Sequence, residues 1–256
     1  MNRKEYKGYL VDLDGTMYKG KQRIEEAAPF ITRLKDKDIP YVFVTNNSTS
    51  SPEEVAKKLV NHFDVPAEAS EIYTSSLATA DYLKTLEGNK VLVVGERGLV
   101  EALTQAGFEL TSEDPDHVVV GLDRNLNYEK VVQATLAIQK GASFIATNKD
   151  TNLPTERGLM PGAGSLVAMI ETATQTPPTF VGKPEAIMMA GAVEKIGLNK
   201  EDVLMVGDNY ETDILAGINN GIDTLLVLTG FTSRDDLKLV NTQPTYIVET
   251  LDHWEE

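Results

Sequence analysis

Two aspartates, Asp12 and Asp14, stand two positions apart where the apolar run of "GYLVDLDGT" gives way to Gly15. Like charges this close to a core repel each other, so a cation or a substrate must hold them, unless the segment is an ordinary Asp/Gly turn. If residues 8–12 form a strand, Asp12 lies at its carboxyl end, where open α/β sheets place their ligands. Because successive strand residues face opposite sides, the two carboxylates share a side if the strand continues that far.

The same arrangement recurs late in the chain, where the apolar run of "VLMVGDNYETDI" ends at Asp208 and Asp213 follows in the next helical turn. Four carboxylates at the ends of two central strands are costly together unless a hard cation lies among them. Mg²⁺ prefers oxygen ligands and keeps waters and substrate phosphate in the rest of its shell. The pattern therefore predicts a magnesium site made by Asp12, Asp208 and the backbone carbonyl of Asp14, with Asp213 either as a further ligand or as a carboxylate behind the ligands.

Two more expected strands end in groups that bind phosphate. "YVFVTNN" ends in Thr45 and Asn46, and "TFVGKP" leads into Lys183. A hydroxyl, an amide and an ammonium group supply hydrogen bonds and positive charge for phosphoryl oxygens. Asp12 would then attack phosphorus to form an aspartyl-phosphate. Asp14 would act first as the acid for the leaving alcohol and then as the base for the hydrolytic water.

Short Val/Ile/Leu-rich runs alternate with amphipathic stretches along almost the whole chain. Runs that are apolar on both faces are typical of parallel strands covered by helices on each side. We therefore expect an α/β protein with a doubly wound, Rossmann-like parallel sheet. The polar motifs fall near the two ends, so we expect a discontinuous catalytic core over 1–79 and 179–256, and a smaller inserted α/β domain over 80–178.

Composition narrows the class of protein. The 256 residues are 41% hydrophobic and 25% charged, which is typical of a globular protein with a sizeable core. A net charge of −15 disfavours nucleic acid or an anionic membrane as a partner. The chain has no cysteine, which fits a reducing compartment, and its first ten residues lack the apolar run of a signal peptide. We expect a cytoplasmic protein.

In order along the chain, "DLDGT", "VTNN", "VGKP" and "VGDNYETDI" resemble the four motifs of haloacid dehalogenase (HAD) superfamily phosphatases. "FVTNNSTSSPEEVAKKL" and "ATNKDTNLPTERGLMPGAGSLVAMIE" are similar to the NagD-like group, which is also grouped with p-nitrophenyl phosphatases. This resemblance implies a Mg²⁺-dependent phosphomonoesterase that acts on small phosphorylated metabolites. It also implies a large, C2-type α/β cap between the second and third motifs, and it leaves a homodimer through the cap possible.

Carried over by position, the resemblance assigns each motif residue a role. The roles are the nucleophile for Asp12, the acid/base for Asp14, phosphate binding for Thr45, Asn46 and Lys183, and the metal site for Asp208 and Asp213. The segment "ATNKDTNLPTERG" (146–158) also ends an expected strand in polar residues. In a cap loop, Asn148, Asp150 or Arg157 could contact the leaving group of the substrate, and an ordinary surface loop is the alternative.

Two other functions use similar residues. A phosphomutase returns the phosphoryl group to its substrate, and its relatives usually carry a smaller helical cap between the first and second motifs. This chain has only about 30 residues there, too few for a compact domain, which favours a phosphatase. A phospho-receiver signalling module also combines Asp, Thr and Lys at strand ends, but it is a single domain about half this length. The substrate stays open among sugar phosphates, nucleoside monophosphates, pyridoxal phosphate and phosphoglycolate.

Overall fold

The computed structural model describes residues 4–155 and 157–255. Contacts between residues divide the chain into two compact units. The first unit contains the chain up to Thr45, then Pro52–Tyr73, and everything from Lys183 onward. The second unit contains Asn46–Ser51 and Thr74–Gly182. The second unit is thus largely an insertion into the first.

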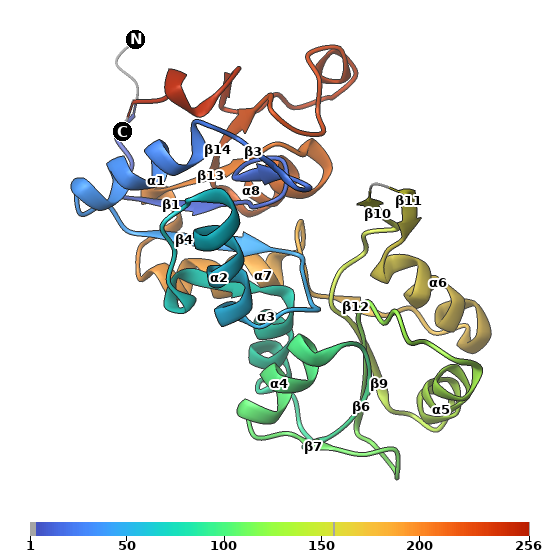
Figure 1. Ribbon diagram of the computed structural model, residues 1–256. Helices are drawn as coiled ribbons and strands as arrows, with labels where there is room; N and C mark the ends of the chain where they lie inside the picture. The colour runs from blue at the N-terminus through green and yellow to red at the C-terminus, as the bar shows by residue number, and fades with distance from the viewer. Residues whose placement is uncertain (1–3, 156, 256) are drawn as a thin grey trace. The chain divides into compact units, whose positions relative to one another are not determined.

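The first unit is built on a six-stranded sheet with the order β15-β14-β13-β1-β4-β5. The strands are β1 (Gly8–Val11), β4 (Tyr41–Thr45), β5 (Ile72–Thr74), β13 (Val203–Gly207), β14 (Asp223–Val227) and β15 (Tyr246–Val248). Strand β1 pairs in parallel with both β13 and β4, although β1 and β13 come from opposite ends of the chain (Figure 1). The predicted parallel core sheet is confirmed.

Helices cover both faces of this sheet. They are α1 (Ala27–Asp36), α2 (Pro52–Phe63), α7 (Ala186–Ile196) and α8 (Leu215–Asn220). On one face, Tyr9 and Val11 of β1 share a core cluster with Phe30 of α1 and Leu59 of α2. The residue between them, Leu10, is equally buried, and α7 contacts both β1 and β4. This double coverage explains why the strands are apolar on both faces.

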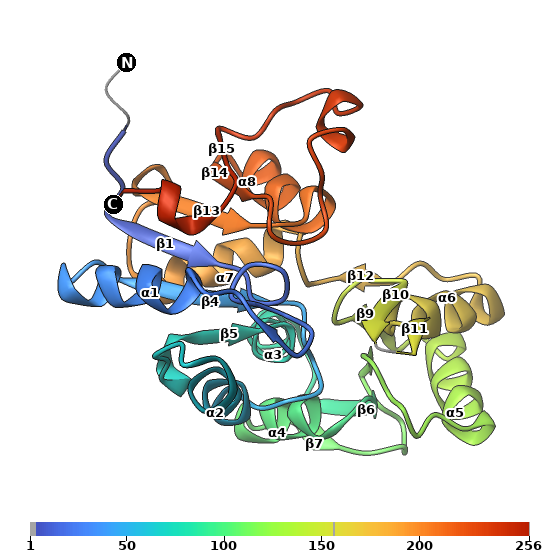
Figure 2. The same cartoon turned by 45° about the horizontal axis from the view of Figure 1, so that its top comes forward.

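The second unit contains a five-stranded sheet, in which all strands are parallel, with the order β12-β9-β8-β6-β7. Its strands are β6 (Lys90–Val94), β7 (Glu109–Leu110), β8 (His117–Val120), β9 (Ser143–Ala146) and β12 (Thr179–Phe180). Its helices are α3 (Ser75–Leu83), α4 (Arg97–Gln105), α5 (Tyr128–Gln139) and α6 (Ala163–Thr174). Helices α5 and α6 lie side by side (Figure 2) and pack on alternate residues of β6 and β8. The expected inserted α/β sheet is therefore present.

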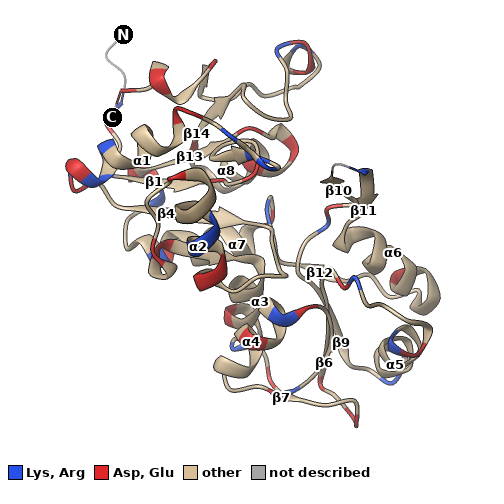
Figure 3. Ribbon diagram, in the orientation of Figure 1, with Lys and Arg blue, Asp and Glu red and all other residues tan. Residues whose placement is uncertain are grey.

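Short elements complete the chain. They are the hairpins β2 (Tyr18–Lys19)–β3 (Gln22–Arg23) and β10 (Asn152–Thr155)–β11 (Gly158–Pro161), the 3₁₀ turns η1 (Ala69–Glu71), η2 (Lys200–Asp202), η4 (Asp236–Lys238) and η5 (Leu251–His253), and the π-helical turn η3 (Tyr210–Ile214). Acidic and basic residues are interspersed over the elements of both units (Figure 3). Within residues 4–155 and 157–255, no helix has the length and apolar character that crossing a membrane requires.

The division into units differs from the range 80–178 expected for the insert. The second unit begins earlier because α3 packs against α4, and it ends later because β12 pairs with β9. The strand expected in "TFVGKP" thus belongs to the second sheet. The second unit also includes Asn46–Ser51, which lies in the chain between β4 and α2.

The last described residues fold back onto the first unit. Trp254 is buried, its indole N–H donates to the hydroxyl of Tyr9 at 3.2 Å, and its ring lies 5.0 Å from that of Tyr246. The guanidinium of Arg33 donates to the carbonyl oxygens of Leu251 and Trp254 at 3.1 and 3.2 Å. These contacts tie the C-terminal segment to β1 and α1.

We expect the substitution Trp254→Ala to lower the free energy of unfolding by about 3–5 kcal/mol, because it removes a large buried ring and leaves a cavity. Urea unfolding followed by circular dichroism measures the change. His253→Ala is the matched control, because His253 is the exposed neighbour, and we expect a change within about 0.5 kcal/mol. Similar small losses in both variants would show that the C-terminal segment does not stabilise the first unit.

Candidate active site

Two neighbouring strands of the first unit place carboxylates at the same edge of the sheet. Asp12 directly follows β1, and its N–H still donates to the carbonyl of Val206 in β13 at 2.9 Å. Asp208 directly follows β13, so both side chains leave the sheet at its carboxyl edge. Open α/β sheets bind their ligands at this edge.

The chain turns sharply after Asp12, and β1 does not continue to Asp14. The carbonyl of Leu13 accepts the N–H of Met17 at 2.7 Å, and Gly15 adopts a φ of +100°. A Cβ atom on Gly15 would lie 2.2 Å from a carboxylate oxygen of Asp208, so only glycine fits there. Asp14 is consequently exposed, while Asp12 is buried. Asp12 and Asp14 were expected to share a side if the strand continued to Asp14, and that condition is not met.

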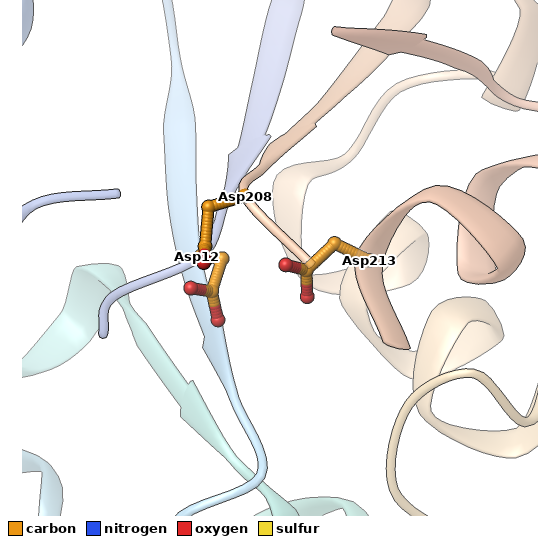
Figure 4. A group of neighbouring side chains, drawn as sticks. All are labelled: Asp12, Asp208 and Asp213. Atoms are coloured by element: carbon orange, nitrogen blue, oxygen red, sulfur yellow. The ribbon is translucent and has the colours of Figure 1, made fainter. Parts of the chain in front are cut away.

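Three carboxylates converge at this edge. Each of Asp12, Asp208 and Asp213 offers an oxygen that lies within 4.8 Å of the other two, and all three side chains are buried (Figure 4). Asp213 comes from the turn η3, where its Oδ2 accepts the N–H of Asn209 at 3.1 Å. The tight helical turn η3 thus brings the carboxylate of Asp213 next to that of Asp208, five positions earlier in the chain.

Lys183 lies inside this carboxylate cluster. Its side chain is buried, and its Nζ lies 2.5 Å from Oδ1 of Asp12 and 2.7 Å from Oδ1 of Asp213. Burial by itself would lower the pKa of Lys183, but the charges of Asp12 and Asp213 outweigh burial and raise it. The lysine therefore remains an ammonium ion at neutral pH.

Burial and mutual repulsion oppose ionisation of two of these carboxylates. Burial raises the pKa of Asp12 well above its usual range, the charge of Asp213 adds to the effect, and Lys183 opposes it. Burial likewise raises the pKa of Asp208 to about 7, again with a contribution from Asp213. The backbone N–H of Phe231, which donates to Oδ2 of Asp208 at 2.6 Å, lowers that pKa in part.

The donor set fits a hard divalent cation. When ionised, three carboxylates and one ammonium group leave two net negative charges in a buried site. A divalent cation balances that charge, and oxygen atoms are the ligands that Mg²⁺ prefers. The cluster of Asp12, Asp208 and Asp213 therefore has the composition of a metal site.

The predicted phosphate-binding residues fall in different places. Thr45 is the buried last residue of β4, which pairs with β1 on the side opposite β13. Its hydroxyl group therefore belongs to a strand that neighbours the strand of Asp12. Lys183 contacts the carboxylates directly, as described above, whereas Asn46 belongs to the second unit.

The predicted cap residues also separate into two groups. Asn148 and Asp150 both contact Asn46: the Asn148 amide donates to the Asn46 carbonyl at 2.8 Å, and Asp150 accepts from the Asn46 amide. Arg157 lies exposed in the turn of the hairpin β10–β11, where its N–H donates to Oγ1 of Thr155 at 3.1 Å. The structure thus brings Asn148 and Asp150 together with Asn46, whereas no contact with Asn46 is described for Arg157.

Sequence reasoning did not assign two contacts to the site. The hydroxyl of Thr16 lies 3.4 Å from carboxylate oxygens of both Asp12 and Asp208. Its position in "DLDGT", directly after the turn glycine, could have indicated this contact. Phe231 contributes only its backbone N–H, which any residue except proline could supply, so its side chain gives no indication of the contact.

Comparison with known proteins agrees with this geometry. A family model of haloacid dehalogenase-like hydrolases matches residues 9–109, and a HAD-hydrolase-like model matches residues 180–254. The chain is 49% identical to the 5′-nucleotidase YutF of Bacillus subtilis over 252 residues, which cover 98% of each chain. It is 48% identical to an acid sugar phosphatase of Staphylococcus haemolyticus over 250 residues, covering 97% of this chain and 95% of the relative.

Solved structures give the same result. A double mutant of the thermostable NPPase of Geobacillus stearothermophilus superposes with a TM-score of 0.93 at 52% identity, with 99% of each chain covered. NagD of Escherichia coli K-12 also superposes with a TM-score of 0.93, at 36% identity, with 98% of this chain and 99% of NagD covered. The chain therefore belongs to the haloacid dehalogenase superfamily, in its NagD-like p-nitrophenyl phosphatase family with an inserted α/β cap.

Proposed function

We propose that this phosphatase hydrolyses a sugar phosphate or a nucleoside monophosphate through a covalent intermediate on Asp12. The observation that carries the proposal is the buried cluster of Asp12, Asp208 and Asp213 around Lys183. Relatives named as a 5′-nucleotidase and as an acid sugar phosphatase are almost equally similar to the chain, so both substrate classes are candidates. Pyridoxal phosphate and phosphoglycolate belong in the same test panel.

In the proposed ground state, Thr45, Asn46 and Lys183 bind the phosphoryl oxygens of the substrate. Asp12, Asp208, the backbone carbonyl of Asp14 and, directly or through water, Asp213 would hold Mg²⁺. Its positive charge would offset repulsion between the nucleophile and the phosphate dianion. Lys183 adds a fixed ammonium group next to Asp12. It favours the ionised form of that carboxylate, which is the form that can attack.

The reaction then proceeds in two displacements. A carboxylate oxygen of Asp12 attacks phosphorus, and the bond from phosphorus to the ester oxygen breaks while Asp14 donates a proton to the leaving alcohol. Asp14 next takes a proton from water, which attacks phosphorus and releases Asp12 and inorganic phosphate. The exposure of Asp14 suits this role, because both the leaving group and the water must reach it.

The first unit would act as the catalytic core, and the inserted unit, predicted over 80–178, would act as the cap that shapes substrate choice. The contact of Asn148, Asp150 or Arg157 with the leaving group, a homodimer through the cap, and a cytoplasmic location stay predictions. Full-length similarity to phosphatases favours hydrolysis over phosphomutase chemistry. The presence of two units does not fit a single-domain phospho-receiver.

We expect Asp12→Asn to lower kcat for p-nitrophenyl phosphate by at least about a thousandfold, because the covalent nucleophile is lost. The variant should remain folded, since burial raises the pKa of Asp12 and a neutral side chain is tolerated there. Release of inorganic phosphate with Mg²⁺ and with chelator measures the effect, and Asp36→Asn on the exposed end of α1 is the matched control. Turnover that survives in Asp12→Asn would refute the assignment of the nucleophile.

The same assay on a panel of natural esters decides between the substrate classes. The panel contains a hexose phosphate, a purine and a pyrimidine nucleoside monophosphate, pyridoxal phosphate and phosphoglycolate. We expect the highest kcat/KM for a member of the first two classes. A preference for either of the last two esters would overturn the proposed substrate class while leaving the phosphatase mechanism intact.

The raised pKa of Asp208 predicts how metal binding depends on pH. The folded, metal-free protein holds this proton more tightly than the unfolded chain, so it loses stability as the pH rises from about 4 to about 7, with no further loss above. Mg²⁺ binds the ionised site, so at about 100 times its Kd it should raise the melting temperature by about 5 °C at pH 8. The increase should be smaller at pH 6, where protons compete.

Asp208→Asn provides the comparison. Without metal, we expect the variant to be more stable than the parent at pH 8 and similar to it below about pH 4, where Asp208 is protonated in the folded and unfolded parent alike, because the amide of the variant never ionises. With Mg²⁺, its melting temperature should not rise. Differential scanning calorimetry measures both effects, and an equal Mg²⁺-induced rise in parent and variant would exclude Asp208 as a ligand.

A further inference from the structure

The segment Asn46–Ser51 directly follows Thr45, the residue predicted to bind phosphate, and several of its backbone groups form hydrogen bonds within the inserted unit. The carbonyl of Asn46 accepts from the hydroxyl of Ser75 at 2.7 Å and from the amide of Asn148 at 2.8 Å. The carbonyl of Ser48 accepts from the hydroxyl of Ser76 at 3.0 Å. Both serines begin helix α3, so the start of that helix fixes the segment.

Helix α4 holds the middle of the same segment. The N–H of Gly98 donates to the carbonyl of Thr49 at 3.1 Å. A Cβ atom on Gly98 would lie 2.6 Å from the backbone of Ser50, so the helix can approach this closely only with glycine. The segment therefore packs against helices α3 and α4 of the insert.

The side chain of Asn46 is oriented by a carboxylate. Its Nδ2 donates to both oxygens of Asp150, at 3.2 and 3.1 Å. A carboxylate only accepts hydrogen bonds, so it fixes which end of the amide faces it. An amide nitrogen carries two hydrogens, so this contact also sets the direction of the second one. A Cβ atom on Gly182 would lie 2.6 Å from Oδ1 of Asn46, which shows how closely the amide is enclosed.

Asn148 connects the two partners. It is buried, its amide nitrogen bonds the backbone of Asn46, and its Oδ1 accepts the N–H of Asp150 at 3.1 Å. Asn148 thus holds the Asp150 loop and the Asn46 backbone at the same time. Residues about a hundred positions later in the chain thereby set the conformation of the residue after Thr45.

We propose that Asp150 and Asn148 are positioning residues for phosphate binding, which act by holding Asn46 in the conformation that binds the phosphoryl group. The inference rests on the proposed phosphate-binding role of Asn46. It gives the insert a part in recognising the phosphate, which every substrate shares, in addition to the choice of leaving group. Direct contact of Asp150 with the leaving group would instead affect each ester differently.

The experiment compares Asp150→Ala, Asn46→Ala and the double variant. Steady-state kinetics use p-nitrophenyl phosphate, a hexose phosphate and a nucleoside monophosphate, and inhibition uses inorganic phosphate, which has no leaving group. We expect Asp150→Ala to lower kcat/KM about tenfold for all three esters, chiefly through KM, and to weaken inhibition by phosphate by a similar factor. The double variant should be no worse than Asn46→Ala, because Asp150 acts through Asn46.

Three controls make the outcome decisive. Asp81→Ala, at an exposed aspartate on α3, should leave all constants unchanged. Asp150→Asn keeps an acceptor oxygen and should recover part of the loss, and it replaces Asp150→Ala if that variant does not fold. Asn148→Ala should weaken phosphate inhibition in the same direction as Asp150→Ala.

Unchanged inhibition by phosphate together with ester-dependent losses would overturn the inference in favour of a leaving-group contact. Additive losses in the double variant would overturn it as well, since Asp150 would then act independently of Asn46. Calorimetric binding of inorganic phosphate to parent and variants tests the inference without turnover. A parent that binds phosphate but hydrolyses no ester would refute the proposed function and leave the positioning role to be decided by that binding.

Discussion

The buried contact between Lys183 and the carboxylates of Asp12 and Asp213 is the interaction on which the site depends. Removing these charges from water is unfavourable, and the short distances of 2.5 and 2.7 Å offset that cost only in part. The remaining imbalance appears as the raised pKa values of Asp12 and Asp208. A divalent cation among the three carboxylates would balance this excess of negative charge.

Backbone contacts hold the carboxylates of this unfavourable cluster in place. Asp12 is held by the extended ladder to β13, and Asp208 is held by its neighbours Gly15 and Phe231. Both strands lie in the middle of a sheet that helices cover on each face, so neither can shift to separate the charges. The hydrophobic core of the first unit therefore stabilises an arrangement that its polar residues alone would not adopt.

The boundary between the two units falls within a sequence motif, "VTNN". Thr45 belongs to the first unit, and Asn46, the next residue, belongs to the second. The hydrogen bonds of Asn46 to Ser75, Asn148 and Asp150 all lie within the insert. One polar motif of the sequence is thus divided between the two units.

The sequence by itself determined the parallel strands, the strand-end carboxylates and the family, because hydrophobic periodicity and contiguous motifs are local properties. Only the tertiary structure decided that β1 ends before Asp14, that β12 joins the second sheet, and that Asn46 bonds Asp150. The residues of that last pair are 104 positions apart. Pairings over such distances depend on how whole elements pack, and no local pattern of residues encodes them.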